Sequence, residues 1–236
     1  MKRFFSPGSI LLLLMMAYYA AGDLFRDPSG WILMKLIILP GIIVGLSFHE
    51  FAHAYVADKL GDDTPRRQGR LTLNPGAHID PVGFIALIFV GFGWGQPVEI
   101  DPRHFRNPRR DELMVDLAGV VMNLILAVIF TFVLKIFIVA TGVWPSMDTL
   151  LGITGEIIVY VIYMNLILMV FNLLPVPPLD GFNVITELFD LRRYDWWYTL
   201  YNNGFIILLI LIFFDFTDRI LTPILDFFWQ FVTMIL

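Results

Sequence analysis

Residues 31–57 read WILMKLIILPGIIVGLSFHEFAHAYVA, a stretch long and apolar enough to cross a bilayer as one helix. Its second half nevertheless contains three ionisable side chains, His49, Glu50 and His53. Ionisable groups inside a membrane span are costly to insert and usually serve a function. The stretch therefore predicts a membrane helix that carries a functional site, and Pro40 predicts a bend before that site.

The composition of the whole chain also indicates a membrane protein. Of its 236 residues, 58% are hydrophobic and 16% are charged, and the mean hydropathy is +0.74. The net charge of −5, with basic residues confined to short loops, argues against a nucleic-acid-binding protein. Because the chain has no cysteine, disulfides and thiolate metal sites are excluded, and any metal must be held by His, Asp or Glu.

Apolar stretches elsewhere in the chain predict further spans. They lie at residues 5–21, 113–140, 153–174, 196–214 and 220–236. The apolar run at 82–92 is too short to cross a bilayer and predicts a re-entrant or interfacial segment. The expected fold is therefore an all-α polytopic membrane protein of about six transmembrane helices, with a short re-entrant or β-like segment.

Loop charges predict how these spans are oriented. If the six stretches alternate, twelve of the sixteen Lys and Arg residues fall in loops on one side. The positive-inside rule makes that side cytoplasmic. Both termini are then cytoplasmic, and the motif at 49–53 lies toward the cytoplasmic end of its span.

The N-terminus has an alternative interpretation. Its basic start, its apolar run and the sequence YYAAGD at 18–23 also fit a secretory signal peptide, although removing it would spoil the even span count. No internal repeat, low-complexity tract or long linker is present. We therefore expect residues 1–236 to form a single integral-membrane domain.

His49, Glu50 and His53 form the pattern H-E-x-x-H. On a helix, residues four apart share a face, so both imidazoles can bind one tetrahedral zinc ion while the glutamate contacts a zinc-bound water. The pattern thus predicts one Zn²⁺ per chain. The alternative is a pair of helix-end histidines bonded to neighbouring carbonyls.

A third zinc ligand must come from elsewhere in the chain. His78 and His104 lie in charged loops, which makes them weak candidates. The segment NLLPVPPLDG at 172–181 is a better source, because its three prolines must unwind the end of a span. Irregular backbone at membrane depth is tolerated only beside protein or a wet cavity. Asp180 lies at the end of the unwound part of this segment, just before Gly181. The alternative role for Asp180 is an N-cap.

Four stretches together resemble the site-2 protease family of intramembrane zinc metalloproteases. They are the H-E-x-x-H helix, GRLTLNPGAHIDPVG at 69–83, AGVVMN at 118–123 and NLLPVPPLDG at 172–181. The resemblance implies a catalytic core of three spans within about residues 31–183. One departure is Val120, where the family commonly has proline. The chain has no room for a PDZ or CBS module and looks like a compact form.

The resemblance also implies a role for each site residue. It makes His49, His53 and Asp180 the zinc ligands, Glu50 the general base and Asn123 a donor to the developing oxyanion. A helix-bridging amide is the alternative role for Asn123.

The implied function is hydrolysis of peptide bonds within or near transmembrane helices of membrane-bound substrates. The expected partners are a transmembrane protein substrate, the lipid bilayer and a regulatory membrane protein, with no nucleic acid, and the expected location is a prokaryotic plasma membrane. The segment VGFGWGQPVEI at 90–100 could pair with an unwound substrate as a strand edge, or could be a re-entrant turn. A CAAX-type prenyl protease and a non-catalytic membrane transporter or adaptor are the alternatives.

Overall fold

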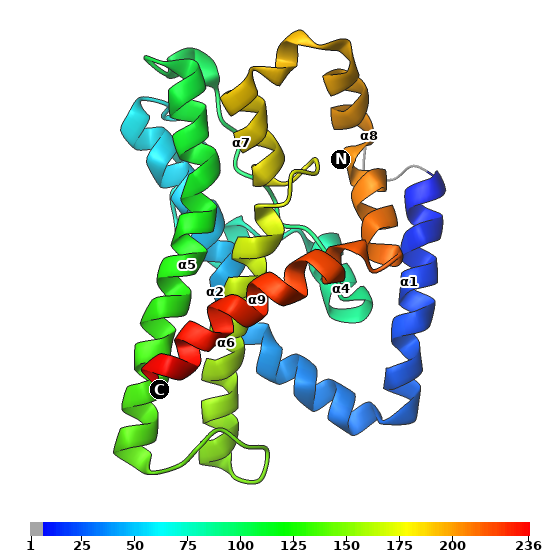
Figure 1. Cartoon of the computed structure of the whole chain (residues 1–236), viewed down its shortest axis with the longest axis vertical. Helices are drawn as coiled ribbons and strands as arrows, with labels where there is room; N and C mark the ends of the chain where they lie inside the picture. Colours follow the sequence, from blue (N-terminus) through cyan, green and yellow to red (C-terminus); the bar gives the residue numbers. More distant parts are fainter. Residues whose placement is uncertain (1–6) are drawn as a thin grey trace.

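The computed structural model describes residues 7–236, and the part of the chain so described is helical with no β-strand (Figure 1). Two predicted features, the basic residues Lys2 and Arg3 and the start of the first span at 5–6, lie outside the described residues. The α-helices are α1 (Pro7–Arg26), α2 (Pro28–Leu60), α3 (Thr64–Arg67), α4 (Pro81–Val90), α5 (Pro108–Thr141), α6 (Leu150–Asn172), α7 (Asp180–Phe189), α8 (Asp195–Phe213) and α9 (Phe216–Ile235). Short 3₁₀ turns are η1 (Pro75–Ala77), η2 (Pro102–His104) and η3 (Leu191–Arg193).

Helices α2, α5 and α6 pack against one another and form the centre of the molecule (Figure 1). Two glycines of α2 allow the close approach of α6. A Cβ atom on Gly41 would lie 2.7 Å from the carbonyl oxygen of Tyr160, and one on Gly45 would lie 2.5 Å from Leu168 Cδ1. Small residues at such contacts are how membrane helices gain packing interactions. Pro40 lies inside α2, and Figure 1 shows this helix changing direction along its length.

In the described part of the chain, four helices have the length and hydropathy to cross a membrane. They are α2, α5, α6 and α8. The predicted first and last spans also form helices, α1 and α9, but the charged residues Asp218, Arg219 and Asp226 interrupt the apolar character of α9. The structure thus supports a polytopic all-α membrane protein, and the count of six spans stays a prediction.

The segment between α2 and α5 folds beside the motif-bearing half of α2. The apolar run at 82–92 corresponds to α4, a ten-residue helix too short to span a bilayer. After Gly91 the chain turns back so that Trp94 packs on Gly83, where a side chain would collide with the Trp94 backbone. The predicted β-like character of 90–100 amounts to one isolated bridge, between Ile79 and Gly95.

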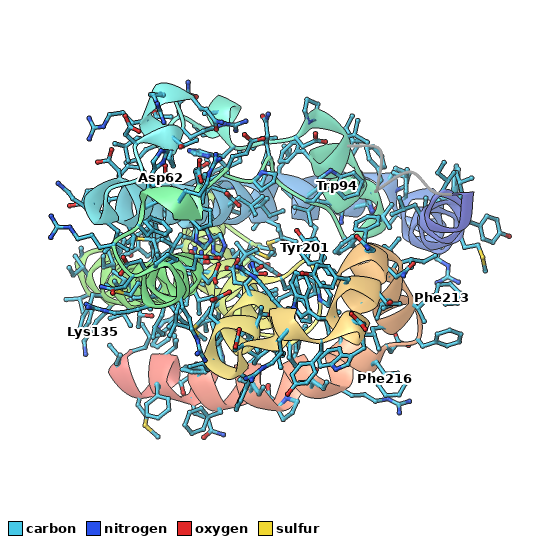
Figure 2. The ribbon with its side chains drawn as sticks, turned by 90° about the horizontal axis from the view of Figure 1, so that it is seen from above. Asp62, Trp94, Lys135, Tyr201, Phe213 and Phe216 are labelled. Atoms are coloured by element: carbon cyan, nitrogen blue, oxygen red, sulfur yellow. The ribbon has the colours of Figure 1, made fainter. Side chains whose placement is uncertain are left out.

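The C-terminal third packs against the central helices. Irregular residues 173–179 connect α6 to α7, as the prolines there predicted. Helix α9 crosses α6 and α5 obliquely (Figure 1), and its last turn is capped by Lys135 of α5, whose Nζ donates to the Ile235 carbonyl at 2.6 Å. Seen end-on in Figure 2, Tyr201 of α8 lies toward the middle of the molecule, whereas Phe213 and Phe216 lie at its edge.

Candidate metal centre

Three side chains from two helices converge at the centre of the molecule. His49 Nε2 lies 3.0 Å from His53 Nε2 and 3.1 Å from Asp180 Oδ2, and His53 Nε2 lies 3.4 Å from the same oxygen. Tetrahedral zinc with bonds of about 2.0–2.1 Å places its ligand atoms about 3.3 Å apart. The spacing of the three atoms therefore matches a zinc site with one open position.

Hydrogen bonds at the far side of each ring fix the tautomers of the histidines. His53 Nδ1 lies 2.7 Å from the Val115 carbonyl, which can only accept, so Nδ1 carries the proton. His49 Nδ1 lies 2.7 Å from Asn123 Oδ1. Both Nε2 atoms therefore present lone pairs to the site, and these outer contacts are the kind that orient zinc-binding imidazoles.

Asp180 completes a set of three acceptors that face one another. Its Oδ2 atom is buried and has no hydrogen-bond donor of suitable geometry among the described residues. Three facing acceptors repel each other unless a cation lies between them, and His49 and His53 are both more than nine-tenths buried. The donor set thus fits Zn²⁺. Asp180 is the first residue of α7 and makes no capping hydrogen bond, so the N-cap alternative is not observed.

The side chain of Asn123 contacts His49 and is not part of the wall of the cavity that His49 and Glu50 line. Its Nδ2 donates to the Gly45 carbonyl at 3.1 Å and to Asn165 Oδ1 at 2.9 Å, which directs Oδ1 toward His49. The amide is fully buried and joins α2, α5 and α6. In this arrangement Asn123 orients the His49 ring, as a helix-bridging amide would, and its predicted contact with an oxyanion stays a prediction.

Gly119 of α5 lies directly against both imidazoles. A Cβ atom there would lie 2.5 Å from His49 Cε1 and 2.5 Å from His53 Nε2. Only glycine leaves room for two rings at this distance. Helix α5 continues unbroken through Val120, so the departure from the family pattern does not interrupt the helix that supports the site.

Glu50 borders the trio without joining it. Its Oε2 accepts a hydrogen bond of 3.0 Å from the backbone N–H of Val98. Together with His49 and Asp180 it faces a cavity of about 210 Å³. The rest of the cavity wall is mostly apolar and includes Phe92, Trp94, Leu168, Phe171 and Phe205. A carboxylate beside a buried donor set and an apolar cavity is suited to proton transfer to and from a bound peptide.

The other two histidines are not part of the group formed by His49, His53 and Asp180. His78 is buried and its Nε2 bonds the Thr72 carbonyl at 2.7 Å. His104 pairs with Asp62 at 3.0 Å in the turn after α2. Burial raises the pKa of the Asp62 carboxyl, but hydrogen bonds from Thr64, Asp101 and His104 outweigh burial and leave this pKa below its ordinary value. His78 and His104 thus contact other residues of the loops between α2 and α5.

Three contributors to the site were not predicted from the sequence. They are the Val115 carbonyl, Asn165 and Gly119. Gly119 belongs to the AGVVMN stretch that also contains Asn123, and this was the one feature of the sequence that could have marked Gly119 as part of the site. A backbone carbonyl has no sequence signature.

Comparison with known proteins identifies the group to which this site belongs. The family model described as peptidase family M50 matches residues 37–212. YwhC of Bacillus subtilis, named for zinc metalloprotease activity, is 40% identical over 194 residues, which cover 82% of this chain and 87% of YwhC.

More distant relatives carry names of the same kind. Rip2 of Mycolicibacterium smegmatis is 30% identical over a match that covers 75% of this chain and 69% of Rip2. MJ0611 of Methanocaldococcus jannaschii is 30% identical over a match that covers 70% of this chain and 78% of MJ0611. No solved structure gives a significant match. The family match covers most of the chain, including every residue of the metal centre, and the chain therefore belongs to peptidase family M50, the site-2 protease family.

Proposed function

We propose that this chain cuts peptide bonds within or near the transmembrane helices of membrane-bound proteins. Membership of peptidase family M50 makes it an intramembrane zinc metalloprotease, and does not favour the prenyl-protease or transporter alternatives. The observation that carries the substrate class is the place of the donor set. His49 and His53 lie within a membrane-spanning helix, beside a cavity with a mostly apolar wall. A substrate that reaches them from the bilayer is itself apolar.

Glu50 is the residue that moves protons in this proposal. Bound zinc would polarise the peptide carbonyl and lower the pKa of the attacking water. Glu50 accepts the proton of that water and returns it to the leaving amine. The N–H of Val98 holds the Glu50 carboxylate at the edge of the cavity, where both transfers can occur.

A helical substrate must unwind before cleavage, because its carbonyls are engaged in hydrogen bonds. The backbone at 94–98 forms no helix and makes one isolated bridge at Gly95, and Trp94, Gly95 and Pro97 line the cavity. We propose that the unwound substrate lies along this segment and pairs with it as an added strand. The position of Gly95 and Pro97 in the cavity wall, close to Glu50, supports this role.

The remaining expectations concern topology and setting. We propose that α1 and α9 complete six spans in a prokaryotic plasma membrane, with the metal centre toward the cytoplasmic side and a regulatory membrane protein as a further partner. The basic loops around 59–70 and 103–110 support this orientation. The bacterial and archaeal relatives fit a prokaryotic origin.

A panel of membrane helices would test the proposed substrate class. Replacing alanine with glycine near the cleavage site lowers helix stability by about 1 kcal/mol, which corresponds to about a fivefold faster cleavage if unwinding precedes it. The purified protein in lipid vesicles should cut such helices and leave a prenylated soluble peptide intact. Preference for the prenylated peptide, or rates that ignore helix stability, would contradict the proposal.

A further inference from the structure

Helix α7 brings Asp180 to the metal centre, yet it is only ten residues long and follows an irregular connection. A helix rises about 1.5 Å per residue, so Glu187 lies about 10 Å along α7 from Asp180. Because a short helix moves as a rigid rod, whatever holds its C-terminal end also sets the position of Asp180.

An ion-pair network fixes that end of α7 to α5. Arg192 of η3 reaches Glu112 of α5 at 2.6 Å and Glu187 of α7 at 2.8 Å. The Glu187 side chain is only 7% exposed and that of Glu112 is 12% exposed. Burial raises the pKa of Glu187, which the charge of Arg192 opposes.

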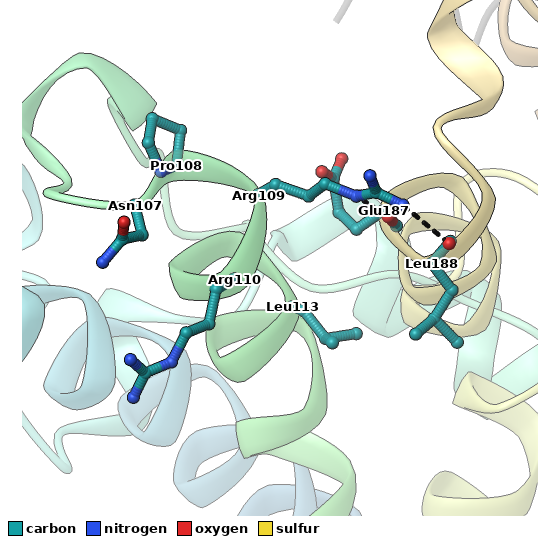
Figure 3. A pocket seen from close by; sticks show the side chains of 7 residues that line it. All are labelled: Asn107, Pro108, Arg109, Arg110, Leu113, Glu187 and Leu188. Carbon is teal, nitrogen blue, oxygen red and sulfur yellow. Dashed lines mark hydrogen bonds between the residues drawn. The ribbon is translucent and has the colours of Figure 1, made fainter.

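Two further contacts hold α7. Figure 3 shows Arg109 extending from α5 to the last turn of α7, where its Nη2 donates to the Leu188 carbonyl at 2.7 Å and its Nε donates to the Glu187 carbonyl. Cations at a helix C-terminus also interact favourably with the helix dipole. On the other side, Trp197 of α8 donates to Thr186 Oγ1 at 2.8 Å.

We infer that Glu112, Glu187 and Arg192 are positioning residues that hold Asp180 against His49 and His53. The inference rests on the assignment of Asp180 as a zinc ligand. Arg192 joins α7, which carries that aspartate, to α5, which supplies the hydrogen-bond partners of both histidines. The Arg192 guanidinium, together with that of Arg109, therefore fixes α7 relative to α5 and so the distance between the two halves of the metal centre.

The test is Arg192→Gln, with Arg193→Gln as the matched control. Arg193 bonds Phe189 and Asp190 at the end of α7, and its guanidinium lies over the ring of the adjacent Tyr194, so these contacts do not join α7 to α5. Outer contacts of metal ligands typically contribute 10–100-fold to affinity. Because Arg192 acts on Asp180 only through α7, we expect Arg192→Gln to weaken zinc binding about tenfold, the lower end of that range, in competition with a chelator, and Arg193→Gln to bind as the unaltered protein does.

A double variant separates positioning from stability alone. Arg192→Gln leaves Glu112 and Glu187 without their partner, which lowers the unfolding temperature, and adding Glu187→Gln removes the more buried of the two charges. If the network positions Asp180, zinc affinity and the visible spectrum of the Co²⁺-substituted protein stay altered in the double variant while its unfolding temperature recovers. If affinity and spectrum recover together with stability, the inference is wrong.

A conservative variant covers the case in which Arg192→Gln does not fold. Lysine keeps the charge of Arg192 but presents one ammonium, whereas the guanidinium contacts both carboxylates through Nη2 and reaches Glu112 a second time through Nη1 at 3.5 Å. Arg192→Lys should bind zinc with an affinity between those of the unaltered protein and the glutamine variant, and an unchanged affinity would contradict the inference. None of these measurements uses a substrate, so failure to cut membrane helices would overturn the proposed function and leave this inference standing.

Discussion

At the scale of single residues, the three proposed ligands contribute unequally to the site. His49 and His53 come from one helix and are each held by a contact with α5, at Asn123 and Val115. Asp180 arrives from a separate helix, and its Oδ2 has no hydrogen bond that would hold it in place. Measuring zinc retention after changing Asp180 is therefore the most informative test of which side chains bind the ion.

Asp180→Ala should lower the zinc content of the purified protein well below one per chain, because two imidazoles alone leave the ion short of protein ligands. Asp180→Asn should lower it less, since one oxygen remains. Metal analysis after dialysis measures both. Asp195→Ala, in the first turn of α8, is a control that removes a carboxylate from outside the site. Full zinc retention by Asp180→Ala would refute its assignment as a ligand.

Glu50→Gln should separate zinc binding from catalysis. Glutamine keeps the oxygen that accepts the Val98 N–H but cannot take a proton from water, so zinc should stay near one per chain. Cleavage of a membrane-embedded reporter should fall on the order of 10²–10⁴-fold. The control variant Asp218→Asn, at an exposed position on α9, should cleave the reporter normally. Substantial activity in Glu50→Gln would rule out the general-base role.

At the scale of elements, the site depends on how closely α5 approaches α2. Gly119 is the point of contact, since both imidazoles occupy the space where a side chain would be. Gly119→Ala should push the two helices apart and weaken zinc binding by about tenfold or more. Gly22→Ala is the control, because a Cβ on Gly22 of α1 meets nothing within 4 Å. Chelator competition measures both, and equal affinities would show that α5 tolerates the added methyl group.

The same scale explains what the sequence could and could not predict. The H-E-x-x-H pattern is local, because helix geometry alone brings His49 and His53 together. Three prolines marked the break before Asp180. The contact between His49 and Asn123 joins residues 74 positions apart, and the role of the Asn123 oxygen follows from its neighbour Asn165. Only the packing of α2, α5 and α6 reveals it.

The α7 network shows the same limit. Glu112, Glu187 and Arg192 look like ordinary charges at span boundaries in the sequence, and only folding brings Arg192 within 3 Å of both carboxylates. The alternation of apolar stretches predicted the helices themselves well. Hydropathy could not tell whether α1 and α9 cross the membrane. A helix that lies on the membrane surface can have the same mean hydropathy as one that crosses it, above all when the helix is short or contains charges.

At the scale of the whole molecule, orientation in the membrane is the property to test. The chain has no cysteine, so single cysteines can be introduced without background. Cysteines at Gly61 and Asn107 should react with a membrane-impermeant thiol reagent only from the cytoplasmic side, and one at Ser146 only from the outside. Labelling of all three positions from one side would overturn the topology and the cytoplasmic placement of the metal centre.

The division of the metal centre between two parts of the chain implies an order of assembly. A ribosome releases α2 and α5 before α7, so the paired histidines and the α5 groups that orient them can dock while the rest of the chain is still being made. Before α7 is made, the two imidazoles alone would hold a zinc ion loosely, and that ion would exchange readily with other metal ions in the cell. If Asp180 is the third ligand, retention of the ion would begin only when α7 has folded against the rest of the site.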